Sequence, residues 1–216
     1  MMPRWFPFGT RSAAEADTPM ESTRFVVIDT ELTSLDRRTN RLLSVGAIAM
    51  TGSKIQVGEQ FYRIVNPGVS VPAEGVVIHR LRPEDIEHGH DLHAALVELM
   101  AFLGNAVLVG HFAEIDRNVL RKEFAAGGVE LDNPMICTAR VQRWIVKKQP
   151  FKEDQFRHLE IADLASLAKI YGLDFHEAHH ALDDAYVTAR LWQKQLHALS
   201  ELGVKTLGSL LRFAKI

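Results

Sequence analysis

The sequence predicts a single α/β domain with a mixed sheet that helices cover on both faces. Predicted strands come first along the chain and later alternate with predicted helices, an order typical of such a sheet. The chain has 216 residues, of which 47% are hydrophobic, so it can bury a sizeable core. We expect the folded domain to cover residues 23–216.

Residues 1–22 are expected to form an irregular or disordered tail. Prolines, a glycine and small polar residues interrupt this segment, which makes it a poor helix or strand. Its aromatic residues leave open that it docks on a partner, but a loosely packed tail is the favoured interpretation.

The first predicted strands form an antiparallel meander. Phe25–Ile28 is a short apolar run with β-branched residues, typical of a buried strand. Two further strands over residues 41–50 and 54–65 are joined by "TGS", a turn signal that favours antiparallel pairing.

Helices dominate the second half of the chain. Apolar residues recur at helical spacing in residues 92–103. Short apolar runs at 106–110 and 134–138 predict two more strands. The remaining segments are expected to be helices, at 113–126, around 140–146, 161–171 and 181–202, and a short closing helix at 207–213.

Composition narrows the class of protein. A net charge of −2 means that any contact with nucleic acid must come from a local patch. The single cysteine, Cys137, excludes an internal disulfide and a cysteine-based zinc site, and it favours a reducing compartment. No run approaches the roughly 20 apolar residues that cross a bilayer, and the start of the chain does not resemble a secretory signal. We therefore expect a cytoplasmic protein without membrane contact.

Two weaker signals each have two interpretations. The cluster "HGHDLH" (residues 88–93) could hold a metal, but a solvated loop entering a helix is favoured. Arg140, Arg143 and Lys147 share one face of a predicted helix. They form either a phosphate-contacting patch or an ordinary solvated face.

Two carboxylates lie at the end of the first buried strand. Asp29 and Glu31 are two residues apart, so on a strand they point to the same face. Like charges this close repel and are costly to bury unless a cation lies between them. The alternative is that Asp29 already lies in a solvated turn.

A third carboxylate, Asp116, falls within the apolar stripe of the helix predicted at 113–126. Its neighbours three and four residues on are Val119 and Leu120. An unpaired carboxylate in this position would be costly. The alternative is an ordinary N-terminal helix cap.

The stretch "EAHHALDDAY" (residues 177–186) carries a histidine pair and an aspartate pair. On a helix starting at Ala181, Asp184 lies at the rim of the apolar face, and Asp183 lies nearly opposite that face. His179 is five residues before Asp184, so the two can act together only if His179 lies on the preceding loop. There it suits a proton acceptor.

Three segments together resemble the motifs of the DEDDh-type 3′ to 5′ exonucleases. The segments are "FVVIDTELTSLD", "LVGHFAEIDRNVL" and "HHALDDAYVTARL", in the family's order and context. The family includes the epsilon subunit of bacterial DNA polymerase III, RNase T and oligoribonuclease. The resemblance covers about residues 24–196.

The resemblance implies a ribonuclease H-like fold with a five-stranded mixed sheet. It implies metal ligation by Asp29, Glu31, Asp116 and Asp184, with His179 as the general base. An all-carboxylate set suits two Mg²⁺ or Mn²⁺ ions.

The activity implied is hydrolysis of the terminal phosphodiester of single-stranded or frayed 3′ ends, which releases nucleoside 5′-monophosphates. DNA is favoured over RNA as the substrate. A loose association with a DNA polymerase is left open, and the alternative function is a non-catalytic module that binds a 3′ end or a protein.

This chain departs from the usual family pattern in its first two motifs. Leu32 and Ser34 replace the first Thr and the Gly of Asp-x-Glu-Thr-Thr-Gly, and Phe112 and Ile115 stand where Asn and Phe are usual. By the resemblance, the residues that line the site of the 3′ nucleotide are Leu32, Ile78 and His79. The departures therefore bear on base or sugar preference.

Overall fold

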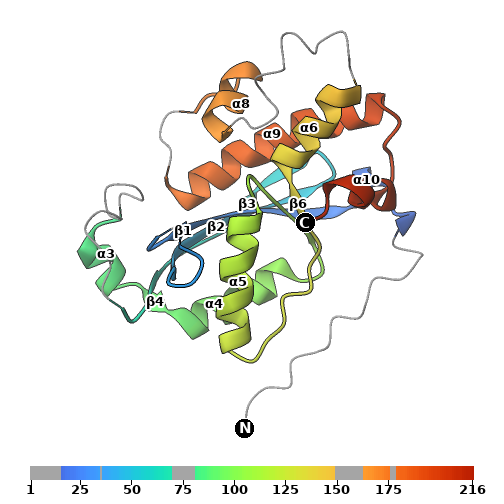
Figure 1. The fold of residues 1–216 in the computed structure, drawn as a ribbon. Coiled ribbons are helices and arrows are strands. Elements are labelled where there is room, and N and C mark those ends of the chain that lie inside the picture. Colours follow the sequence, from blue (N-terminus) through green and yellow to red (C-terminus); the bar gives the residue numbers. More distant parts are fainter. Residues whose placement is uncertain (1–15, 35, 70–80, 149–162, 176–178) are drawn as a thin grey trace.

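The computed structural model describes residues 16–34, 36–69, 81–148, 163–175 and 179–216 (Figure 1). Its six-stranded sheet has the order β4-β3-β2-β1-β5-β6. The strands are β1 (Arg24–Leu32), β2 (Leu42–Thr51), β3 (Lys54–Asn66), β4 (His90–Asp91), β5 (Val107–Gly110) and β6 (Met135–Cys137). The first three form the expected antiparallel meander, and β5 and β6 add in parallel beside β1.

The mixed sheet is confirmed, but the expected count of five strands is wrong by one. The additional strand, β4, has two residues and pairs in parallel with the end of β3 through Val65↔His90 and Asn66↔Asp91. It lies within the "HGHDLH" segment, for which the sequence favours a loop. A strand this short has too few residues to produce an alternating pattern, so sequence periodicity cannot reveal it.

Helices cover both faces of the sheet, as expected. The helices of the described residues are η1 (Met20–Ser22), α3 (Pro83–Glu87), α4 (Leu92–Leu103), α5 (Glu114–Ala126), α6 (Thr138–Lys148), α8 (Leu164–Ile170), α9 (Ala181–Glu201) and α10 (Leu207–Ala214). Figure 1 shows α4 and α5 on one side of the sheet, and α6, α8 and α9 on the other. No helix in the described parts of the chain has the length and apolar character needed to span a membrane.

The alternation of β1 explains why both faces are covered. Val26 and Ile28 point into the core that contains α4 and α5, while Phe25 and Val27 point into the core formed with α9 and α10. All four side chains are fully buried. A strand buried on both faces therefore reads as a continuous apolar run, because neither face meets solvent.

The end of the expected tail packs against the domain. Met20 is buried among residues of β1, α9 and α10, and Pro19 forms a β-bridge with Thr206. Ordered structure therefore begins before residue 23, because the apolar Met20 side chain has a place in the core. The aromatic residues of the tail lie in the segment 1–15, outside the described residues.

Candidate active site

Asp29 and Glu31 lie near the end of β1 and face the same side of the sheet. Asp29 pairs with Gly46 of β2, and Glu31 pairs with Ser44, after which the register shifts. Asp29 is thus a residue of the strand, and the alternative of a solvated turn is wrong. Glu31 is 8% exposed, so its carboxylate is largely removed from water.

Asp116 comes to the same place from α5. The residue that caps this helix is Ala113, and Asp116 lies in the first turn with its side chain buried. The Thr30 hydroxyl donates a hydrogen bond of 2.6 Å to Asp116 Oδ1. Asp116 is therefore tied to β1, between the two acidic residues of that strand, and does not cap its own helix.

Asp184 is brought in by the first turn of α9, which lies directly on β2. Gly46 permits this approach, because a Cβ atom at this position would overlap the backbone of Ala181 and Leu182. Asp184 is 7% exposed. Its Oδ2 accepts a hydrogen bond of 2.8 Å from the backbone N–H of His179, and its buried Oδ1 has no partner among the described residues.

The structure separates the two histidine–aspartate pairs of this segment. His179 lies on the loop before α9 with an exposed side chain and a φ of 75°. His180 is the N-cap residue of α9, and its ring lies 4.7 Å from the Tyr62 ring. Its Nδ1 lies 3.1 Å from Asp183 Oδ2, and Asp183 is exposed. The second pair therefore faces away from the buried carboxylates.

Burial and mutual repulsion shift the pKa values of the carboxyl groups upward. Burial raises the pKa of Glu31 to about 8, with further contributions from the charges of Asp184 and Asp116. Burial likewise raises the pKa of Asp116 to about 7, against the opposing hydrogen bond from Thr30. The pKa values of Asp29 and Asp184 are also raised, chiefly by burial. Such a cluster is costly for the protein unless positive charge enters it.

The donor set fits a hard divalent cation. Glu31, His179 and Asp184 each offer a ligand atom, and these atoms lie within 4.8 Å of one another. Asp184 Oδ1, which has no hydrogen-bond partner in the described structure, has an acceptor position to spare. Carboxylate oxygens with at most one nitrogen favour Mg²⁺ or Mn²⁺ over softer metals.

The carboxylates open into a cavity of about 460 Å³. Apolar side chains form part of its wall, among them Leu32, Phe112, Ile115, Leu164 and Phe175. Leu32 thus lines the cavity, as the resemblance implies. Ile78 and His79, the other two residues expected to bind the 3′ nucleotide, lie outside the described residues.

Sequence reasoning missed His111, which also lines this cavity. It directly follows β5, is buried, and has Nδ1 2.8 Å from the Thr138 hydroxyl. The available signal was its position, because a polar residue immediately after a buried strand next to β1 lies at the same sheet edge as the carboxylates.

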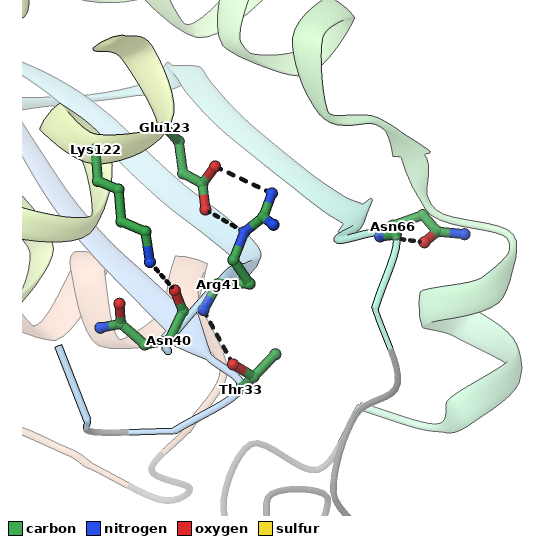
Figure 2. A network of polar contacts seen from close by, with 7 residues as sticks. Thr33, Asn40, Arg41, Asn66, Lys122 and Glu123 are labelled. Carbon is green, nitrogen blue, oxygen red and sulfur yellow. Dashed lines mark hydrogen bonds and ion pairs between the residues drawn. The ribbon is translucent and has the colours of Figure 1, made fainter. Parts of the chain in front are cut away.

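A polar network links Thr33, Asn40 and Arg41 to α5 (Figure 2). Arg41 Nε lies 2.8 Å from Glu123 Oε1, and the Glu123 side chain is only 2% exposed. Lys122 donates to the Asn40 carbonyl at 2.6 Å, and the Arg41 N–H donates to the Thr33 hydroxyl at 3.0 Å. Because Thr33 lines the cavity, these contacts connect its rim to α5.

The two weaker sequence signals have different outcomes. His88, His90 and His93 are exposed, and in the described parts of the chain the only grouping with metal-ligand spacing is that of Glu31, His179 and Asp184. The metal interpretation of "HGHDLH" therefore has no support.

The phosphate-contacting patch on α6 stays a prediction. Arg140 forms an ion pair with Glu114 at 2.9 Å and donates to the Lys215 carbonyl, while Lys147 is exposed.

With this geometry established, comparison with known proteins identifies the family. Residues 26–192 match the RNase_T family model, which describes an exonuclease. The chain belongs to this exonuclease family. The match spans all four carboxylates and His179.

Relatives of this exonuclease domain are named as bacterial DNA polymerase III proteins. It is 28% identical to the DNA polymerase III subunit epsilon of Aquifex aeolicus over 176 residues, which cover 81% of each chain. It is 25% identical to the PolC-type DNA polymerase III of Thermotoga petrophila over 195 residues, which cover 90% of this chain. The domain spans only 13% of the length of that protein. It is also 28% identical to a DNA polymerase III subunit epsilon-like protein of Rhodobacter capsulatus, of which it spans 27%.

Solved structures confirm the fold. The domain superimposes on E. coli Exonuclease I, solved in complex with a dT13 oligonucleotide, with a TM-score of 0.70 and 17% identity, covering 84% of this chain and 42% of the other. Exonuclease X in complex with 5′ overhanging duplex DNA gives a TM-score of 0.60 at 19% identity, covering 83% and 93%. The shared fold is the expected ribonuclease H-like one.

Proposed function

We propose that this protein is a metal-dependent 3′ to 5′ exonuclease that removes nucleoside 5′-monophosphates from single-stranded or frayed 3′ ends. The observation that carries the proposal is the convergence of four carboxylates and one exposed histidine on a single cavity. The carboxylates come from β1, α5 and α9, and three of them are buried below one-tenth exposure. Burying four acidic groups side by side is costly unless a cation binds among them, and such clusters of shifted pKa values concentrate at functional sites.

The metal ligands would be Asp29, Glu31, Asp116 and Asp184, as the resemblance implies. When bound, two Mg²⁺ or Mn²⁺ ions would neutralise the scissile phosphate, lower the pKa of the attacking water and stabilise the leaving 3′ oxygen. The raised pKa values mean that the carboxyl groups exchange protons for metal on binding.

His179 would act as the general base. Its side chain is exposed and lines the cavity, its backbone N–H donates to Asp184 Oδ2 at 2.8 Å, and a ring nitrogen lies within 4.8 Å of carboxylate oxygens of Glu31 and Asp184. An imidazole accepts a proton from water near neutral pH. The hydroxide formed in this way would attack the phosphorus of the terminal phosphodiester. The bond between phosphorus and the 3′ oxygen of the preceding nucleotide would break, and the last nucleotide would leave as a nucleoside 5′-monophosphate.

DNA is the proposed substrate, with RNA as the second choice. The support is the naming of relatives as DNA polymerase III subunits and the DNA bound in the related Exonuclease I and Exonuclease X structures. A cavity of about 460 Å³ has the size of a small-ligand site and can hold one nucleotide. We also propose a loose association with a DNA polymerase, on the same relatives.

The test is release of labelled nucleotide from matched DNA and RNA oligomers. Each oligomer carries a label at its 3′ end or its 5′ end, and reactions contain Mg²⁺, Mn²⁺ or EDTA. We expect metal-dependent release of the 3′ label as a mononucleotide, faster from DNA. Retention of intact oligomer under all conditions would support the alternative, a module that binds 3′ ends without cutting them.

A further inference from the structure

Phe112 has an unusual backbone conformation on the wall of the cavity. Its φ of 51° lies in the left-handed region, which residues with a bulky side chain rarely adopt. The side chain is half-buried and lines the cavity. Strain of this kind persists only where the surroundings impose it, and it concentrates at sites that contact ligands.

The preceding residue fixes the position of the Phe112 ring. The rings of His111 and Phe112 lie 4.5 Å apart at 60°. His111 Nδ1 lies 2.8 Å from Thr138 Oγ1, and the Thr138 hydroxyl donates to the Gly110 carbonyl at 3.3 Å. His111 Nδ1 and the Thr138 hydroxyl therefore form a hydrogen bond whose direction depends on the tautomer of the imidazole. The hydrogen bond to Thr138 thus orients the His111 ring, and the His111 ring packs against the Phe112 ring.

The cavity wall around Phe112 suits a nucleobase, because it is apolar and lies in the same cavity as the carboxylates proposed to act on the phosphate. Leu32, Phe175 and the carboxylate of Asp116, four residues after Phe112, line the same cavity. The family usually has Asn at the Phe112 position and Phe at the Ile115 position. In this chain the aromatic ring is therefore displaced by three residues, and the aliphatic Ile115 is 37% exposed.

We propose that Phe112 is a substrate-binding residue that stacks on a nucleobase at or next to the 3′ end. The proposal rests on the proposed function, since it needs a nucleic acid in the cavity. Stacking on an aromatic ring tolerates any base but requires that a base be present. Phe112→Leu should therefore weaken binding of oligodeoxythymidine by about 5- to 100-fold, and Phe112→Tyr should keep nearly all of it.

The experiment uses the full chain and three oligomers that carry a 5′ fluorophore. One oligomer is unmodified, one lacks the base of the last nucleotide, and one lacks the base of the penultimate nucleotide. Binding is measured by fluorescence anisotropy in Ca²⁺, and KM and kcat are measured in Mg²⁺. We expect wild type and Phe112→Leu to differ on the unmodified oligomer and to bind at least one abasic oligomer equally. Thermal melting of both variants controls for folding.

An equal loss on all three oligomers, or no loss on any, would overturn the proposal, because the ring would then act only through packing or not at all. The two proposals fail separately. Wild-type protein that releases no nucleotide in any metal would refute the exonuclease activity. The anisotropy comparison would still show whether Phe112 contacts a base.

Discussion

Asp183 and Asp184 are adjacent and chemically identical, yet the fold gives them opposite environments. Asp184 is 7% exposed and faces the other three carboxylates, while the Asp183 side chain is 69% exposed beside His180. Helical geometry separates neighbouring residues by about 100°, so only one of them can face the sheet. The difference between them is therefore a difference of position alone.

Replacing these two aspartates by alanine should have unequal effects on activity. Asp184→Ala removes a proposed metal ligand and should lower nucleotide release by about 10³-fold or more, a loss of roughly 4 kcal/mol in transition-state stabilisation. Asp183→Ala should leave activity within about threefold. Release rates at saturating Mg²⁺ check this, with circular dichroism to confirm folding. Equal losses in two folded variants would refute the assignment of Asp184.

The sequence singled out residues whose expected burial conflicts with their charge. An acidic residue inside an apolar stripe or at the end of a buried strand is conspicuous because it is costly, and this is how the four carboxylates stood out. His111 and Phe112 produced no such conflict in the sequence. The position of His111 after a buried strand was the one available signal, and its contacts with Thr138 and Phe112 are seen only in the structure.

At the scale of elements, the contact between α9 and β2 depends on a glycine in β2, because this residue has no side chain. Gly46 faces the backbone of Ala181 and Leu182 at the start of α9. Any side chain there must push the helix away from the sheet, and Asp184 and His179 would move with it.

Gly46→Ala should therefore reduce both stability and activity. Overpacking against backbone costs about 1–3 kcal/mol, and the displaced Asp184 should lower activity by at least tenfold. Gly58→Ala is the matched control, because Gly58 is an exposed residue of β3 and a methyl group added there would have no atom within 4 Å. Urea denaturation and nucleotide release measure the two effects. Similar behaviour of the two variants would contradict this account of the contact.

The ion pair between Arg41 and Glu123 ties the segment after β1 to α5 (Figure 2). Arg41→Ala should cost about 3–5 kcal/mol, because it leaves the buried Glu123 carboxylate without its partner. Arg24→Ala should cost at most about 1 kcal/mol, since its ion pair with Glu59 is exposed. Chemical denaturation of both variants provides the comparison. A loss in Arg41→Ala no larger than that in Arg24→Ala would show that the pair contributes little.

At the scale of the whole molecule, the acidic cluster opposes folding unless it is neutralised. It joins β1, α5 and α9, so its repulsion acts between elements on both faces of the sheet. Burial raises the pKa of Glu31 from an ordinary 4.5 to about 8, so between these values the folded state binds more protons than the unfolded state. Stability therefore falls as pH rises through this window.

Metal-free protein should have a lower Tm at pH 8.5 than at pH 6. Glu31 alone contributes on the order of 2 kcal/mol, or about 4–8 °C for a chain of this size. Mg²⁺ or Mn²⁺ should restore most of the loss, because cations replace the protons. Differential scanning fluorimetry with EDTA or metal measures this. Glu31→Gln should flatten the dependence of Tm on pH, whereas the exposed control Glu59→Gln should not. A Tm of metal-free wild type that does not change with pH would contradict the proposed link between protonation of the cluster and stability.

The sequence alone determined the α/β class, the antiparallel meander, the helices on both faces and the carboxylates that stand out from the core. These features follow from local periodicity and from the cost of burying charge, and both are written in short stretches of chain. Only the tertiary structure decided the two-residue strand β4, the docking of Met20, the approach of α9 over Gly46 and the support of Phe112 by His111. Each of these depends on packing and backbone geometry that local sequence preference does not encode, and most join residues that are distant along the chain.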